Sequence, residues 1–229
     1  MTLLDELAIQ TLILRERFAR DTGQWAKLRD AYHPDASRTR IRTMWHDGDI
    51  DGFVSGSKKL HTSSGAVIHQ VVPAEFEIKG WKAVADCWCF ITARLEMNQH
   101  DYELKTSLRL LYRCEKVKGE WKLISLEPIY IHDLLAPVPP APSLELPCLE
   151  GLRKSYKFTA WMVQQRGITV ANDLPGEDVP KECGGYTTQA FRVAQRPIKC
   201  SQSYSTNSAI DQIQSKLVQD YSIPGTSSR

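Results

Sequence analysis

Residues 81–97 of this chain read WKAVADCWCFITARLEM, residues 102–117 read YELKTSLRLLYRCEKV, and residues 121–131 read WKLISLEPIYI. Each stretch alternates between apolar and polar side chains with the period of two that is typical of a β-strand. A similar run covers residues 66–77, and the joining segments at Gly80, Asn98–Asp101 and Lys118–Gly119 are rich in turn-forming residues. The pattern predicts an antiparallel meander of long strands, which we expect to twist into a strongly curved sheet.

Helices are predicted on the N-terminal side of this meander. Residues 1–20 carry apolar side chains at helical spacing, and Asp21-Thr22-Gly23 then ends the helix. A second short helix follows at residues 24–32. The other elements expected before the meander are a strand, a turn and a helix, at residues 37–44, 46–49 and 50–60. Asp49 is placed to cap the last of these. The predicted fold class is therefore α+β.

The chain after the meander divides into three parts. Residues 136–148 are rich in proline and predict a linker that ends a domain at residues 1–135. The next part, residues 149–182, contains an amphipathic helix expected at 149–166, which should pack on the domain or on a second copy. Residues 183–229 are rich in serine, threonine and glutamine, and predict a tail of low order.

Composition and motifs exclude several classes of function. The 229 residues carry a net charge of +2 without a basic block, so no nucleic-acid partner is expected. No apolar run reaches the ~18 residues that span a bilayer, so no membrane is expected. The six cysteines are scattered and no secretion signal is recognisable, which indicates a reducing, cytoplasmic setting. Phosphate-binding loops and metal-ligand spacings are missing, so no cofactor and no metal are expected.

Asp21 and His69 are the first candidates for chemistry. Asp21 lies in the corner of the predicted helix pair, and His69 lies at the head of the first long strand. A carboxylate can hold an imidazole in one tautomer, and the imidazole can then transfer a proton. The alternative is that Asp21 caps the second helix and His69 is an ordinary strand residue.

The strand at residues 81–97 supplies a second set of candidates. One of its faces is polar and aromatic, and it carries Asp86, Trp88, Phe90, Thr92 and Arg94. We expect this face to line a pocket, where Arg94 would hold an oxyanion. The alternative is an exposed arginine at the end of a strand. Tyr112 and Tyr130, on the two following strands, would be pocket walls or phenol donors.

Three motifs occur in a recognisable order along the chain. They are Asp21-Thr22-Gly23-Gln24-Trp25-x-x-Leu28, Tyr32-His33-Pro34-Asp35-Ala36 and Lys118-Gly119-Glu120-Trp121-Lys122-Leu123. Together with the order of elements over residues 3–133, they resemble the SnoaL-like branch of the nuclear transport factor 2-like (NTF2-like) superfamily, which includes scytalone dehydratase. The resemblance implies a cone in which a curved, mostly antiparallel sheet is wrapped around the N-terminal helices and encloses a deep pocket. It also implies acid/base catalysis without a cofactor, and assembly as dimers.

The resemblance to scytalone dehydratase can be followed by residue. Asp21 stands at the position of the pocket aspartate, and His69 at that of the histidine which the aspartate orders. The sequence departs from the pattern at three positions. Arg94 stands in place of a second catalytic histidine, Arg20 in place of a tyrosine, and Leu110 in place of an asparagine.

The expected function is that of a cofactor-independent lyase or isomerase. It would act as a dehydratase, a cyclase or a rearrangement catalyst on a small, oxygenated, apolar metabolite, in secondary-metabolite biosynthesis. In this fold the strand after the second helix borders the pocket mouth, so Arg38 and Trp45 would meet the substrate; the alternative is a solvated sheet edge. A non-catalytic binding or protein-interaction module is the alternative function, and a homodimer or other homo-oligomer is the expected assembly.

Overall fold

Three helices form in the N-terminal part of the chain: α1 (Leu3–Asp21), α2 (Trp25–Asp30) and α3 (Ile50–Ser63). Gly23, at φ +69°, makes the left-handed turn between α1 and α2, a conformation that strains any residue with a side chain. The predicted cap of α3 is confirmed, because Asp49 Oδ1 accepts a hydrogen bond of 2.8 Å from the Gly52 amide.

This computed structural model describes residues 3–63, 67–139 and 149–179. These residues belong to one compact unit, Met1–Pro197. The tail predicted at residues 183–229 and most of the linker predicted at 136–148 lie outside the described residues. Within the described part of the chain, no helix has the length and apolar character needed to cross a membrane.

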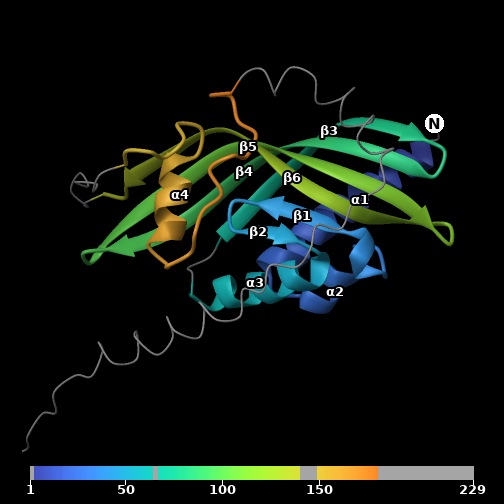
Figure 1. Ribbon diagram of the computed structural model, residues 1–229, viewed down its shortest axis with the longest axis horizontal. Helices are drawn as coiled ribbons and strands as arrows, with labels where there is room; N and C mark the ends of the chain where they lie inside the picture. Colours follow the sequence, from blue (N-terminus) through green and yellow to red (C-terminus); the bar gives the residue numbers. More distant parts are fainter. Residues whose placement is uncertain (1–2, 64–66, 140–148, 180–229) are drawn as a thin grey trace, which may run out of the picture. The chain divides into compact units, whose positions relative to one another are not determined.

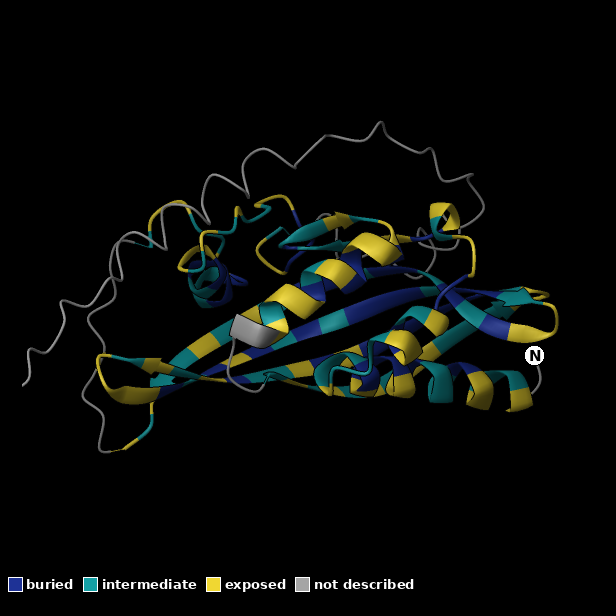
Figure 2. Cartoon of the chain, turned by 90° about the horizontal axis from the view of Figure 1, so that it is seen from below, coloured by how far each residue is buried: buried dark blue, intermediate teal, exposed yellow. Residues whose placement is uncertain are grey.

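Six strands form one sheet in the order β2-β1-β6-β5-β4-β3. Their bounds are β1 (Arg40–Thr43), β2 (His46–Gly48), β3 (Val67–Lys79), β4 (Lys82–Met97), β5 (His100–Val117) and β6 (Glu120–Pro137). The predicted antiparallel meander is confirmed in β3 to β6. Asn98, Gln99, Lys118 and Gly119 all have positive φ, as expected of tight two-residue hairpin turns. The middle of the long strands is buried and their hairpin tips are exposed (Figure 2).

Three predicted elements differ from those observed. The expected strand at 37–44 begins as a 3₁₀ turn, Ala36–Arg38, because the Asp35 side chain accepts a hydrogen bond from the Ser37 amide. The expected turn at 46–49 contains β2, which pairs with β1. The helix expected over 149–166 is reduced to α4 (Lys157–Gln164). The segment before α4 is held instead by Arg153, which binds the Asp178 carboxylate at 2.6 and 2.9 Å.

Strand register decides which face of the sheet the helices cover. His69 on β3 pairs with Ile91 on β4, so it shares a face with Cys89. This face belongs to the main hydrophobic core, together with Ile13 of α1. Trp88 points to the opposite face and is 44% exposed. The helices therefore pack on the face of β4 that carries small apolar side chains, and the polar and aromatic face, which was predicted to line the pocket, lies on the opposite side of the sheet.

The C-terminal segment packs on the same sheet. α4 lies over one end of the long strands, while α2, α3, β1 and β2 lie toward the other end (Figure 1). Asp133 on β6 accepts hydrogen bonds from the amide and the hydroxyl of Thr159, at 2.7 and 2.9 Å, and so caps the first turn of α4. The Glu177 amide donates to the Tyr130 carbonyl at 2.9 Å. These contacts place Tyr156 against Tyr130, with 4.6 Å between ring centroids.

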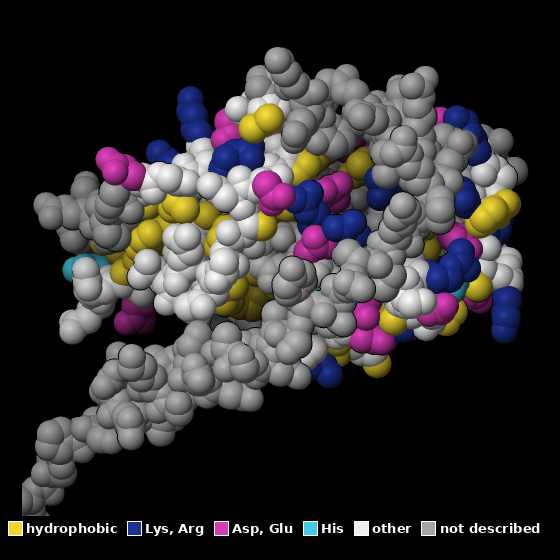
Figure 3. Space-filling view, in the orientation of Figure 1, with side chains coloured by type: hydrophobic (Ala, Val, Ile, Leu, Met, Phe, Trp, Pro, Cys, Tyr) yellow, Lys and Arg dark blue, Asp and Glu magenta, His cyan; other side chains and the backbone are white. Residues whose placement is uncertain are grey.

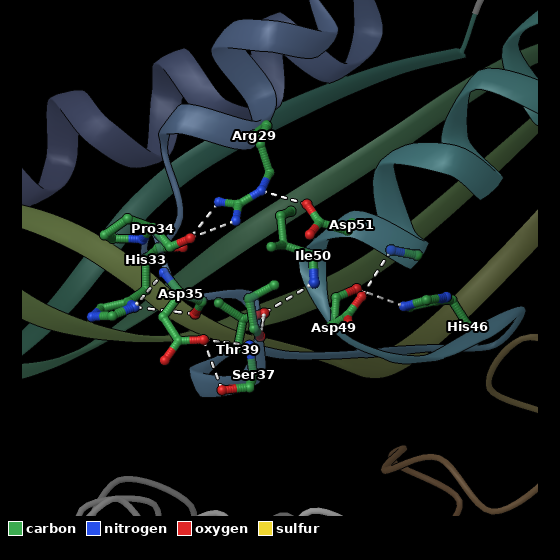
Figure 4. A network of polar contacts seen from close by, with 12 residues as sticks. Arg29, His33, Pro34, Asp35, Ser37, Thr39, His46, Asp49, Ile50 and Asp51 are labelled. Atoms are coloured by element: carbon green, nitrogen blue, oxygen red, sulfur yellow. Dashed lines mark hydrogen bonds and ion pairs between the residues drawn. The ribbon is translucent and has the colours of Figure 1, made fainter. Parts of the chain in front are cut away.

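A polar network fixes the segment between α2 and α3 (Figure 4). Arg29 of α2 donates to the His33 carbonyl at 2.9 Å and binds the Asp51 carboxylate of α3 at 2.5 Å. The His61 ring of α3 meets the Trp25 ring edge-on, with 5.4 Å between centroids. The network thereby holds α3 against the corner between α1 and α2, where Asp21 lies.

Candidate active site

Asp21 and His69 are in direct contact. Asp21 is the last residue of α1, and His69 lies near the start of β3 on the covered face of the sheet. His69 Nδ1 lies 2.7 Å from Asp21 Oδ1, and the His69 amide donates to Asp21 Oδ2 at 2.6 Å. The His69 side chain is 8% exposed and the Asp21 side chain 12%. One carboxylate therefore fixes both the backbone and the ring of the histidine.

The electrostatic surroundings keep His69 neutral. Burial and the nearby Arg20 cation lower the pKa of His69 from 6.5 to about 4, against the opposing effect of Asp21. The hydrogen bonds and charge of His69 lower the pKa of Asp21, although burial opposes this. At neutral pH an ionised Asp21 therefore accepts from Nδ1–H, and the lone pair of the neutral ring lies on Nε2. Among the described residues, His69 Nε2 has no hydrogen-bond partner.

A buried charged cluster on α1 extends from this pair into the core. Glu16 is fully buried, and its carboxylate pairs with Arg17. Tyr32 donates to Glu16 Oε1 at 3.1 Å, and Tyr112 donates to Glu16 Oε2 at 3.4 Å. The sequence analysis missed Glu16 and Arg17. The sequence does indicate that both side chains are buried, because Glu16 and Arg17 follow Ile13 by three and four residues and so continue the apolar stripe of the helix.

Tyr112, Tyr130 and Trp45 lie in or against the core on this side of the sheet. Burial raises the pKa values of both tyrosines, so both phenols stay protonated. Trp45 stacks on Phe53, with 5.2 Å between centroids, and the Arg17 guanidinium lies 5.9 Å from the Phe53 centroid. Phe53 and Tyr112 therefore contact the charged cluster on α1 directly, and Trp45 packs behind Phe53.

Three predicted site residues are engaged elsewhere. Arg94 lies on the exposed face of β4 and pairs with Glu103 at 3.3 Å, so the structure does not bring it to His69. Arg38 donates to the Glu115 carboxylate at 2.6 Å and is not near the pair either. Trp88 lines a hollow of about 420 Å³ on the opposite face of the sheet. The hollow is lined by Val72, Trp88, Phe90, Ser107, Ile131, His132 and Glu177. A cross-strand neighbour binds Arg94, and a residue distant in sequence binds Arg38, so the alternation of side chains does not reveal either partner.

The free thiols on the covered face are poor nucleophiles. Cys87, Cys89 and Cys114 are buried. Burial raises the pKa values of Cys87 and Cys89 to about 12, so both remain thiols at neutral pH. No group of three or more metal-ligating side chains occurs within residues 3–63, 67–139 and 149–179. The contact between His69 and Asp21 is therefore the candidate for proton transfer among the described residues.

The fold and the site together define a class of protein. The sheet is curved and unclosed, N-terminal helices cover one face, and a carboxylate at a helix corner meets an imidazole on the edge strand. This is the NTF2-like architecture, which confirms the predicted fold class. The chain belongs to the SnoaL-like domain family, whose model matches residues 1–127.

Curated relatives are fungal. A PEP2-like protein of Fusarium vanettenii is 26% identical over 184 residues, which cover 75% of this chain and 77% of that protein. An uncharacterized protein of Emericella nidulans is 25% identical over 189 residues, covering 75% of this chain and 78% of that protein. These similarities extend beyond the SnoaL-like domain without naming an activity.

Solved structures support the fold. A candidate scytalone dehydratase from Novosphingobium aromaticivorans superposes with a TM-score of 0.50 at 13% identity, covering 62% of this chain and 97% of that one. A candidate aromatic ring hydroxylase from the same organism also has a TM-score of 0.50 and 13% identity, and covers 60% and 96%. Because these two structures are described by different activities, their similarity to this chain supports the fold and does not indicate which reaction it catalyses.

Proposed function

We propose that this protein is a cofactor-independent lyase or isomerase that acts by acid/base chemistry on a small, oxygenated, largely apolar metabolite. The contact between His69 and Asp21 carries the proposal. It supplies a neutral imidazole whose tautomer is fixed by a largely buried carboxylate, on the face of the sheet that forms the hydrophobic core. Hydrophobic side chains also gather around α4 on the face seen in Figure 3. Dehydration, cyclisation and rearrangement can all use such a pair.

The proposed reaction begins with proton removal by His69 Nε2. The base takes a proton from the carbon next to a carbonyl, and the C–H electron pair becomes the C=C bond of an enolate while the carbonyl oxygen takes the negative charge. The imidazolium is then stabilised by Asp21. In a dehydration the proton returns to the leaving hydroxyl, and in an isomerisation it returns to another carbon.

A non-catalytic binding module is the second candidate, and one observation favours it. Tyr112 is fully buried and Tyr130 is 5% exposed, so both rings fill part of the space that a substrate would need. In that case Glu16 and Asp21 serve only to organise the core.

Deuterium exchange of 2-tetralone, a simple enolisable ketone, tests the proposal. Incubation in D₂O without added cofactor and proton NMR measure loss of the signal next to the carbonyl. We expect the wild-type protein to accelerate exchange, and His69→Asn and Asp21→Asn to remove the acceleration while keeping the circular dichroism spectrum. Arg94→Ala is the matched control and should keep full activity. Unchanged exchange in His69→Asn, or no acceleration by the wild type, would contradict the proposed base.

We also propose that the protein is a homodimer. The exposed Val72, Trp88 and Phe90 on the uncovered face of the sheet support self-association through that face. Sedimentation equilibrium of the full chain tests this assembly, and Trp88→Glu should yield a monomer. A monomeric wild type at micromolar concentration would contradict it.

A further inference from the structure

Arg20 is a largely buried cation with few partners among the described residues. It occupies the last turn of α1, next to Asp21, and its side chain is 14% exposed. Its guanidinium makes one hydrogen bond to the described residues, from Nη1 to Asp21 Oδ1 at 3.3 Å. A guanidinium carries five N–H donors, and the nitrogens of Arg20 are not among the fully buried side-chain atoms that lack a partner in the described residues, so its unused donors can still be reached. Arg20 is therefore equipped to bind a further acceptor.

The carboxylates of the site are already engaged by other groups. Both Glu16 oxygens accept from Arg17, and they also receive the two tyrosine hydroxyls. Asp21 accepts from the ring and from the amide of His69. Burial lowers the pKa of Arg20, and repulsion from the Arg17 cation lowers it further, against the opposing effect of Asp21. An anion bound next to Arg20 would offset its repulsion from Arg17.

Geometry places Arg20 beside the proposed base. Arg20 Nη1 and His69 Nδ1 both contact the same oxygen, Asp21 Oδ1, at 3.3 and 2.7 Å. The two nitrogens are therefore no more than about 6 Å apart. The proposed base, Nε2, is the other nitrogen of the same ring, so one carboxylate oxygen holds both the guanidinium and the ring that carries the base. Two different side chains are thereby placed to reach the carbonyl oxygen and the neighbouring C–H group of one substrate.

We propose that Arg20 binds the carbonyl oxygen of the substrate and stabilises it as an enolate oxyanion, so that the substrate is an enolisable carbonyl compound. This inference rests on the proposed function. His69 Nε2 takes the proton from the α-carbon, the C–H electrons form the C=C bond, and the carbonyl π-electrons move to the oxygen held by Arg20. The charge-assisted hydrogen bond strengthens as negative charge develops, so Arg20 contributes more to the transition state than to substrate binding.

The phenolate of 4-nitrophenol is a coloured mimic of this enolate. Spectrophotometric titration of the bound ligand measures whether the site prefers the phenolate to the neutral phenol. We expect the wild type to prefer the phenolate at least ten-fold, which lowers the apparent pKa of the bound ligand by about one unit. Arg20→Gln should remove the preference, Arg20→Lys should retain part of it, and Arg94→Gln should leave it unchanged.

Different results would overturn the proposed role of His69 as base and the proposed role of Arg20 in binding the oxyanion. His69→Asn should lose exchange of 2-tetralone and keep the phenolate preference, because its Arg20 is intact. An unchanged phenolate preference in Arg20→Gln overturns the role of Arg20, and so does the absence of phenolate binding by the wild type at millimolar concentration. Neither result affects the exchange test of His69. Arg20→Gln should also lower the exchange rate at saturating 2-tetralone more than it raises KM, and thermal unfolding of each variant checks that it is folded.

Discussion

The neutral state of His69 predicts how protein stability depends on pH. The pKa of His69 is about 4 in the folded protein and 6.5 for an unperturbed histidine. Between these two values the unfolded chain binds a proton that the folded protein does not bind. Stability from this group is therefore fully present above pH 6.5 and is lost as the pH falls toward 4.

The size of the effect follows from the two pKa values. They differ by about 2.5, and each pKa unit corresponds to about 1.4 kcal/mol, so the full loss is about 3 kcal/mol. At pH 5.0 about 2 kcal/mol of this loss has developed, because the folded histidine is still mostly neutral. The His69 side chain is 8% exposed, so little of the effect is screened by solvent.

Urea unfolding of the wild type and of His69→Asn at pH 7.5 and pH 5.0 measures the pH-dependent contribution of His69 to the free energy of unfolding. Asparagine keeps a donor near the position of Nδ1, and therefore the bond to Asp21, but it does not titrate. We expect the wild type to lose about 2 kcal/mol more than the variant between the two pH values, since the other groups cancel in the difference. Equal losses in the two proteins would refute the argument that burial keeps the imidazole neutral.

Three further predictions concern the same core. Glu16→Gln should lower the free energy of unfolding by about 3–5 kcal/mol, because it leaves the buried Arg17 without its counter-ion. Urea unfolding measures this loss, and a value below about 1 kcal/mol would contradict the ion pair between Glu16 and Arg17. We expect the wild-type rate of 2-tetralone exchange to stay nearly constant from pH 7.5 to 5.0 and to fall by half near pH 4, after correction for the uncatalysed rate. A midpoint near pH 6.5 would show that the pKa of the base is not lowered. Native protein at pH 8 should resist alkylation by iodoacetamide at the three free cysteines that are buried in the described part of the chain. Peptide mass spectrometry can compare their labelling with that of the urea-unfolded chain, and rapid native labelling would show that these thiols are accessible. They are Cys87, Cys89 and Cys114.

Much of the fold could be predicted from local patterns. Alternation over β4 and β5, together with turn-forming residues such as Lys118 and Gly119, was sufficient for the meander. The break at Gly23 placed Asp21 in a helix corner, and the motif order around it indicated the family. Arg153 shows where the local pattern failed, because the helix expected around it does not form and its side chain instead binds Asp178, which lies far along the chain.

Sequence by itself determined which side chains share a strand face, where the helix around Asp21 ends, and that the chain has an α+β fold. Tertiary structure alone decided which face of β4 the helices cover, and so removed Arg94 from the site and left Arg20 beside His69. It alone also paired Glu16 with Tyr32 and Tyr112. The physical reason is that the period of a helix or strand fixes only how neighbouring side chains are oriented relative to one another. Burial and ion pairing depend on partners that are distant in sequence, and these partners meet only when α1 packs on the sheet.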